Sequence, residues 1–217
     1  MPENIKSQIK ALCSVPSISL SKESCSSTKE QVLLLLEDLK TTSNYSLNEN
    51  DAINKWLDSS WKEVWSDHYN LLPTSDFIKP LYSGIYHSYL QENIRWNFNK
   101  IEFFGFPASL NIKSSFKIKN NIAEFIITNV LIGLQLPQNT DVFDFASFIN
   151  GGGIWGLNVW SKRPKGVIGL RFELKPLFID NDFRVDSLKL KNYVDPSGDA
   201  IDSDYEFIIV YDKCENF

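Results

Sequence analysis

The sequence has few histidines and cysteines, and its basic residues do not form a block. The two histidines, His68 and His87, have no partner at metal-ligand spacing, which argues against a metal site. The three cysteines are odd in number and also lack metal spacing, a pattern more typical of a reducing compartment than of a disulfide framework. A net charge of −5 without a basic block argues against nucleic acid as a partner.

The start of the chain has no long apolar run and no targeting pattern. The longest apolar run in the first forty residues, Val32–Leu36, is far too short to span a bilayer. The opening Met-Pro-Glu-Asn has neither the order of a signal peptide nor the Arg and Ser bias of a transit peptide. We therefore expect a cytoplasmic protein, or one peripheral to a membrane.

Aromatic residues, by contrast, are abundant. The chain contains 15 Phe, 8 Tyr and 6 Trp, and 43% of its residues are apolar. This is more aromatic material than a core of this size needs. The surplus suggests an aromatic-lined cavity or a rim that faces a membrane.

The stretch from Gly84 to Leu136 is predicted to form four consecutive strands, at about 85–91, 94–103, 110–118 and 123–134. Apolar and polar residues alternate in Ile94–Phe98, and this period of two places one face on a core and the other in water. The short joints predict hairpins, so that neighbouring strands pair antiparallel. A meander of this length must close or be covered, because exposed edges would pair with other chains.

The rest of the chain completes a mainly β fold with helices at its N-terminus. Helices are predicted at 3–13, from a capping box at Ser27 to Lys40, and at 49–57. Trp61–Trp65 is predicted as a short first strand with both tryptophans on one face. Further strands are expected at 169–175, 183–190 and 205–213, the second with a bulge near Asp186. About eight strands suffice for a small antiparallel β-barrel of residues 58–217, on which the helical segment 1–57 packs as part of one domain. A membrane or partner role for the helices is the alternative.

No motif in the sequence indicates catalysis. Gly151-x-Gly153-x-x-Gly156 matches the dinucleotide-binding pattern, but Pro164 and Gly166 interrupt any helix that would follow it. The connection 137–165 is long enough for a lid or binding loop. Its aromatic residues are predicted to form a lid or a membrane-dipping surface, or else to fold back over the barrel mouth: Phe143, Phe145, Phe148, Trp155 and Trp160.

A ligand inside the barrel would contact aromatic residues of the inward face. The candidate lining residues, for each of which ordinary core packing is the competing interpretation, are Trp61, Trp65, Trp96, Phe98, Phe103, Phe116 and Phe125. Asp180 and Arg184 flank a predicted turn at Asn181-Asp182, where their side chains are expected to meet. A structural ion pair or turn anchor is one interpretation of these two residues, and a contact with a ligand head group is the other.

Short motifs in the chain resemble those of the plastid lipid-associated proteins, also called fibrillins. The first is Leu57–Ser66, in which Ser59 stands where the family has Gly; Gly84–His87 and Asn93-Ile94 are similar to the motifs that follow it. Phe178–Val185 is similar in residue type to the C-terminal motif Tyr-Leu-Asp-x-x-Leu-Arg-Ile. The basic residue and glycine that usually follow are replaced here by Asp186-Ser187.

This resemblance implies a lipocalin-like barrel at thylakoids or lipid globules of photosynthetic cells. Such proteins bind or organise carotenoids, quinones, tocopherols or other prenyl lipids, usually without catalysis. Two alternatives remain open. One is a lipocalin-like bilin lyase, whose barrel needs acidic or histidine groups for the pyrrole nitrogens. The other is an assembly or scaffold protein whose barrel is filled by its own side chains.

Overall fold

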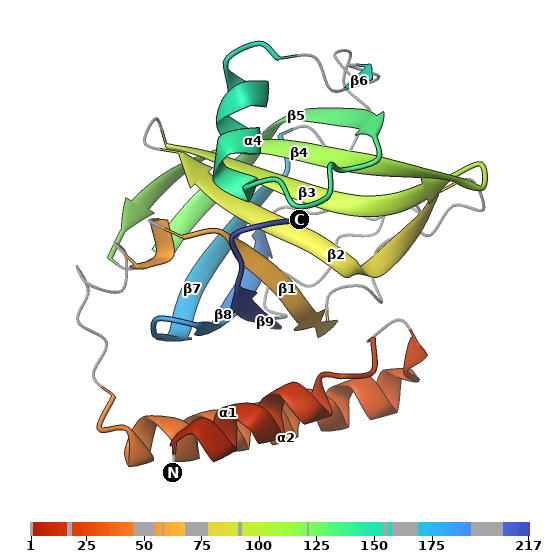
Figure 1. Ribbon diagram of the computed structural model, residues 1–217. Coiled ribbons are helices and arrows are strands. Elements are labelled where there is room, and N and C mark those ends of the chain that lie inside the picture. The colour runs from red at the N-terminus through yellow and green to blue at the C-terminus, as the bar shows by residue number, and fades with distance from the viewer. Residues whose placement is uncertain are drawn as a thin grey trace.

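The computed structural model describes residues 2–16, 19–45, 55–57, 59–67, 78–90, 93–120, 122–153, 156–157, 169–191 and 206–217. Eight antiparallel strands close into a barrel-like ring, and two N-terminal helices lie against its outside (Figure 1). The mainly β fold with N-terminal helices, predicted from the alternation of apolar residues, is therefore confirmed.

The strands follow one another around the ring in the order of the chain. β1 and β9 pair on one side and β4 and β5 on the other, so the ring has no open edge. The short strand β6 (Gly156–Leu157) pairs with β5 outside this ring. The eight ring strands are β1 (Trp61–Ser66), β2 (Ile78–Leu90), β3 (Ile94–Phe103), β4 (Phe106–Lys119), β5 (Ile122–Leu134), β7 (Arg171–Ile179), β8 (Phe183–Lys191) and β9 (Glu206–Lys213).

Residues with positive φ allow the tight turns between the meander strands. Phe104 and Gly105 (φ 50° and 81°) join β3 to β4, and Asn93 and Asn120 (φ 57° and 51°) lie at the neighbouring joints. Glycine and asparagine are the residues that tolerate this backbone region best. β2 begins at Ile78, earlier than predicted. The strand tolerates Pro80 because its pairing with β3 shifts register between Pro80 and Ile85.

Helices α1 (Pro2–Leu12) and α2 (Lys22–Thr42) cover the outer face of β1, β8 and β9. Their buried residues pack against Trp65, Phe183 and Val210, as predicted for the apolar side of this segment. α2 begins earlier than the capping box at Ser27 indicates, because the hydroxyl of Ser21 caps it by accepting from the Ser24 backbone N–H at 3.1 Å.

Another helix, α4 (Val142–Asn150), covers the outer face of β2 and β3 (Figure 1). Asp141 caps its start by accepting from the Asp144 backbone N–H at 2.8 Å. Gly151 caps its end, and Gly152 follows with φ +95°. The glycines therefore end a helix, whereas a dinucleotide fingerprint places them before one. Among the described residues, no helix has both the length and the apolar character needed to cross a bilayer.

Candidate functional site

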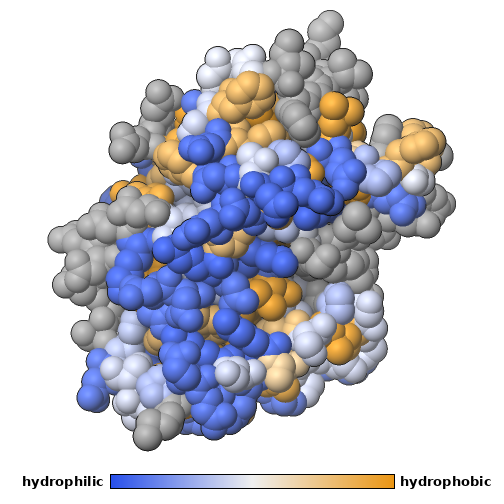
Figure 2. Space-filling view, viewed as in Figure 1, coloured by the Kyte–Doolittle hydropathy of each residue, from blue (hydrophilic) through white to orange (hydrophobic). Residues whose placement is uncertain are grey.

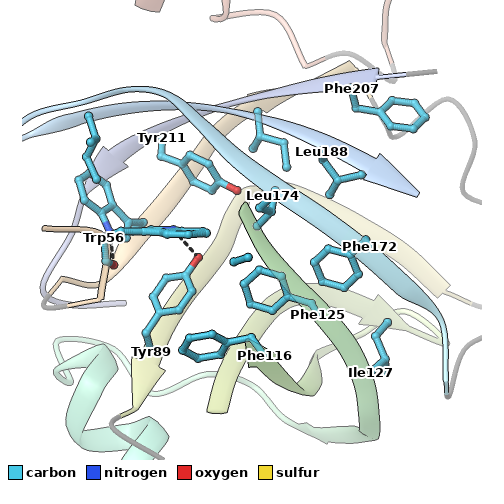
Figure 3. Packing of buried hydrophobic residues seen from close by; sticks show 14 of the residues in the cluster. Trp56, Tyr89, Phe116, Phe125, Ile127, Phe172, Leu174, Leu188, Phe207 and Tyr211 are labelled. Atoms are coloured by element: carbon cyan, nitrogen blue, oxygen red, sulfur yellow. Dashed lines mark hydrogen bonds between the residues drawn. The ribbon is translucent and has the colours of Figure 1, made fainter. Parts of the chain in front are cut away.

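Aromatic rings from neighbouring strands line the interior of the barrel (Figure 3). Phe116 on β4, Phe125 on β5 and Phe172 on β7 face inward side by side. The Phe125 and Phe172 rings stack with centroids 4.9 Å apart, and the Phe116 and Phe125 rings lie 5.4 Å apart. Tyr211 and Phe207 face them from β9. The inner wall is therefore a largely aromatic surface.

Trp56, in a helical turn at residues 55–57, inserts into the same interior. Its ring is fully buried, and its Nε1 donates a hydrogen bond to the Tyr89 hydroxyl at 3.0 Å. The Trp61 Nε1 donates in turn to the Trp56 backbone carbonyl at 3.2 Å. These two bonds tie the segment before β1 to the inside of the ring.

The interior also holds a buried ion pair between Arg184 and Asp186, both on β8 and both 0% exposed. The Arg184 Nε donates to both oxygens of Asp186 at 2.9 Å, and its Nη2 donates to Asp186 and, at 3.2 Å, to the Tyr89 hydroxyl. The guanidinium lies 4.4 Å from the Tyr211 ring centroid and 4.8 Å from that of Trp56. Aromatic faces and one carboxylate thus surround a buried positive charge.

Burial and neighbouring charges change the pKa values of Arg184 and Tyr211 in directions that keep both side chains protonated. Burial by itself lowers the pKa of Arg184, but the Asp186 carboxylate, together with Tyr89 and Tyr211, outweighs burial and raises the pKa above its ordinary value, so the guanidinium stays charged. Burial, with the Asp186 charge adding to it, raises the pKa of the Tyr211 hydroxyl well above its ordinary value. Tyr211 is therefore a hydrogen-bond donor at any physiological pH.

A second polar chain runs through Arg95, His87 and Glu63, which project inward from β3, β2 and β1. The Arg95 guanidinium contacts the His87 Nδ1, and the His87 Nε2 lies 3.4 Å from a Glu63 oxygen. Since a guanidinium only donates hydrogen bonds, Nδ1 is the acceptor in this contact. The guanidinium also lies 5.0 Å from the Phe125 ring centroid.

Other sites in the described part of the chain are weaker candidates. No three His, Cys, Asp or Glu side chains among the described residues are close enough to hold a metal ion. A hollow of about 580 Å³ lies between α1 and α2, where Leu12 and Leu34 contribute to its lining. Another, of about 450 Å³, lies over β4, β5 and β7, with charged residues such as Lys117 and Arg171 around it.

Three of the seven predicted lining residues face the interior, namely Trp61, Phe116 and Phe125. Phe103 lies at the end of β3, and its side chain is outside the described part of the structure. These three residues therefore have the inward orientation that a lining residue needs, and their contact with a ligand stays a prediction.

Three other predicted lining residues face outward, and the prediction was wrong for them. Trp65 packs against the N-terminal helices, because a bulge between Glu63 and Trp65 reverses the phase of β1. Trp96 and Phe98 lie on the outer face of β3, where Phe98 contacts Phe145 of α4 at 5.2 Å between ring centroids. Alternation shows which residues of a strand share a face. Because apolar groups cover both faces of these strands, alternation cannot show which face points into the barrel.

The predicted contact between Asp180 and Arg184 does not form, because the two side chains serve different parts of the structure. Asp180 anchors the turn by accepting from the Asp182 and Phe183 backbone N–H groups at 3.1 and 2.9 Å, and it pairs with Lys6 of α1 at 2.7 Å. Arg184 points into the barrel. The bulge expected near Asp186 is also absent from the β8–β9 pairing, which is continuous, and the irregularity lies instead in β7 between Pro176 and Phe178.

The aromatic residues predicted for a lid divide into two groups in the structure. Phe145 lies on the side of α4 that faces the sheet and is buried against the outer wall of the barrel, so it is not part of a lid over the barrel mouth. Phe143 and Phe148 are 45% and 52% exposed on α4, where Figure 2 shows an apolar area above a largely hydrophilic sheet. Trp155 and Trp160 lie outside the described residues.

Sequence reasoning missed most of the polar groups inside the barrel. Tyr89, Arg95 and Asp186 alternate with outward apolar residues, and alternation by itself predicts a solvent-facing position for a charged side chain. One signal was present for Arg184: the apolar phase of β8 changes along the strand, because the inward positions 184 and 186 are charged while the outward Phe183 and Val185 contact the helices.

No family model, curated protein or solved structure matches this chain in the comparisons.

Proposed function

We propose that this protein binds a lipophilic small molecule inside the barrel. The observation that carries the proposal is the composition of the interior, where an aromatic wall encloses a few buried polar groups such as Arg184, Tyr211 and Arg95. Small-molecule sites in proteins have this composition, with apolar rings that contribute contact area and a few polar groups that orient the ligand.

We also propose membership of the plastid lipid-associated family. The short motifs in the sequence support it, and the closed ring of strands with a helical N-terminal segment agrees with the barrel that the resemblance implies. The ligand would then be a carotenoid, quinone, tocopherol or other prenyl lipid, held without catalysis at a thylakoid or lipid-globule surface.

The affinity of such a site depends on how much of the ligand the barrel encloses. A prenyl chain that buries about 500 Å² gains about 12 kcal/mol at ~25 cal/mol/Å². Association costs of about 4–15 kcal/mol oppose this gain. Because the inner rings contact one another, the prenyl chain of the ligand must replace ring–ring contacts with contacts of its own. We therefore expect substitutions in the aromatic wall to alter ligand affinity most.

Matched substitutions on the two faces of the wall test the proposal. Phe125 and Phe98 are both 0% exposed, but Phe125 faces the interior and Phe98 faces α4. The purified protein should take up plastoquinone or carotenoid from detergent solution. Phe125→Leu should change the measured affinity severalfold, whereas Phe98→Leu should leave it unchanged. Equal effects of the two substitutions would contradict a site inside the barrel.

A second candidate function is the binding of a linear tetrapyrrole, in which case the protein would act as a bilin lyase. The specific observation in its favour is the presence of Glu63, His87 and Asp186 inside the barrel. Carboxylates and imidazole are the groups that would pair with pyrrole nitrogens.

Incubation with bilin and, separately, with plastoquinone or carotenoid distinguishes these functions. Retention of bilin alone, seen as visible absorbance that co-elutes with the protein, would favour the tetrapyrrole and reject the prenyl lipid. Retention of neither would favour an assembly or scaffold protein whose barrel is filled by its own side chains.

A further inference from the structure

The barrel interior contains hydrogen-bond donors without partners. Among the described residues, the Arg184 Nη1, the Arg95 Nε and the Tyr211 hydroxyl have none, although these side chains are 0%, 3% and 0% exposed. In Figure 3 the Tyr211 hydroxyl points toward the middle of the cluster. A buried donor without a partner is costly, because its hydrogen bond to water is lost and nothing replaces it. The arrangement therefore favours a partner that brings acceptor atoms.

Among the described residues of this interior, acceptors without a partner are fewer. Asn97, which faces inward with His87 by register, leaves its Oδ1 without a partner. A half-turn of its amide group would present a donor at this position instead. A ligand head group that only accepts hydrogen bonds therefore suits the site better than one that must donate them.

The charges on the described inner face are balanced. Two basic side chains, Arg95 and Arg184, accompany two acidic ones, Glu63 and Asp186, and His87 Nδ1 already accepts from Arg95. An anionic head group would add a negative charge without a counterion in a place sheltered from water, which is strongly unfavourable. A neutral acceptor would satisfy the same donors and leave the balance unchanged.

We infer that the head group of the ligand is a neutral oxygen acceptor, such as the carbonyl of a quinone or ketone, held by Arg184, Arg95 and Tyr211. This inference rests on the proposed function, and it selects among lipophiles: hydrocarbons without oxygen and free carboxylates or phosphates are the weaker ligands.

Three probes with the same ten-carbon chain and aromatic-sized ring test the inference: decylbenzoquinone, decylbenzene and para-decylbenzoate. Binding to the full chain is measured by equilibrium dialysis near neutral pH. Decylbenzoquinone should bind about tenfold or more tightly than decylbenzene, as expected for hydrogen bonds from charged donors. It should also bind more tightly than para-decylbenzoate. Equal binding of the quinone and the hydrocarbon, or tighter binding of the benzoate, would overturn the inference and leave the proposed lipid site standing.

Tyr211→Phe tests the same head group with little change of shape. It removes one donor that has no partner among the described residues, so the fold should tolerate it. The affinity for decylbenzoquinone should fall about threefold to tenfold, as for one hydrogen bond, while that for decylbenzene stays unchanged. Tyr86→Phe, at a 3% exposed tyrosine on the outer face, is the matched control and should alter neither. Failure of all three probes to bind would reject the proposed function itself, and the inference with it.

Discussion

Replacing Asp186 by Asn removes one negative charge from the barrel interior while it keeps the size of the side chain. Asp186 and its partner Arg184 are both 0% exposed, and the Arg184 Nε lies 2.9 Å from both carboxylate oxygens. The substitution leaves the guanidinium buried without a counterion. Breaking a buried pair in this way costs about 3–5 kcal/mol of stability.

The loss is measured by urea unfolding and by thermal unfolding followed by circular dichroism. For a chain of this size each kcal/mol corresponds to about 2–4 °C, so Asp186→Asn should lower the Tm by roughly 6–20 °C. Asp212→Asn is the control, because Asp212 pairs with Lys10 at 2.8 Å but both side chains are more than a third exposed. That change should cost at most about 1 kcal/mol.

A double substitution separates the charge from the packing. Replacing Arg184 by Met and Asp186 by Leu together removes both charges, and exchanges of this kind are often neutral or stabilising. The double variant should therefore be more stable than Asp186→Asn alone. A loss below about 1 kcal/mol for Asp186→Asn, or a double variant less stable than the single one, would refute the idea that a dehydrated ion pair sits inside the barrel.

Two further predictions concern the N-terminal helices and the cysteines. Lys6 lowers the pKa of the Asp182 carboxyl, so this stabilisation is present above the unfolded-state pKa of about 4 and is lost as the pH falls through the lower folded-state pKa. Lys6→Met should therefore flatten the decrease in unfolding free energy, measured in urea, between about pH 5 and pH 3, and an unchanged pH dependence would contradict the contact. Burial raises the pKa of Cys13 to about 12 and that of the less buried Cys214 to about 11. At pH 8 a thiol reagent should modify Cys214 first and Cys13 only on unfolding, and equal rates would show that α1 does not stay docked.

The number and order of the strands could be predicted from the sequence. Alternating residues from Ile94 to Phe98, turn residues such as Gly105 and Asn120, and the hairpin at Asn181-Asp182 are local signals, and hairpins require only local pairing. The packing of the helices on the sheet could likewise be predicted, because the stripe through Val32, Leu36 and Leu39 has one apolar side that must be buried.

The direction in which each strand faces depended on the tertiary structure. Phe125 faces inward and Trp96 faces outward, although both lie on strands with the same alternation. Alternation groups the residues of a strand into two faces, but α4 and the N-terminal helices give the outer wall an apolar partner as well. A single bulge in β1 then places Trp61 inside and Trp65 outside.

The polar interior was decided by tertiary structure alone. In the sequence, Arg95, Arg184 and Asp186 are charged residues of the kind that usually faces solvent. Such a charge can be buried only when the folded structure holds a counterion or hydrogen-bond partner next to it. Which residues form strands depends on their neighbours along the chain, so the sequence contains the signals that predict the strands. Which groups share the inside of the ring follows from its closure, which brings β1, β3 and β8 around one axis and cannot be deduced from any one of them.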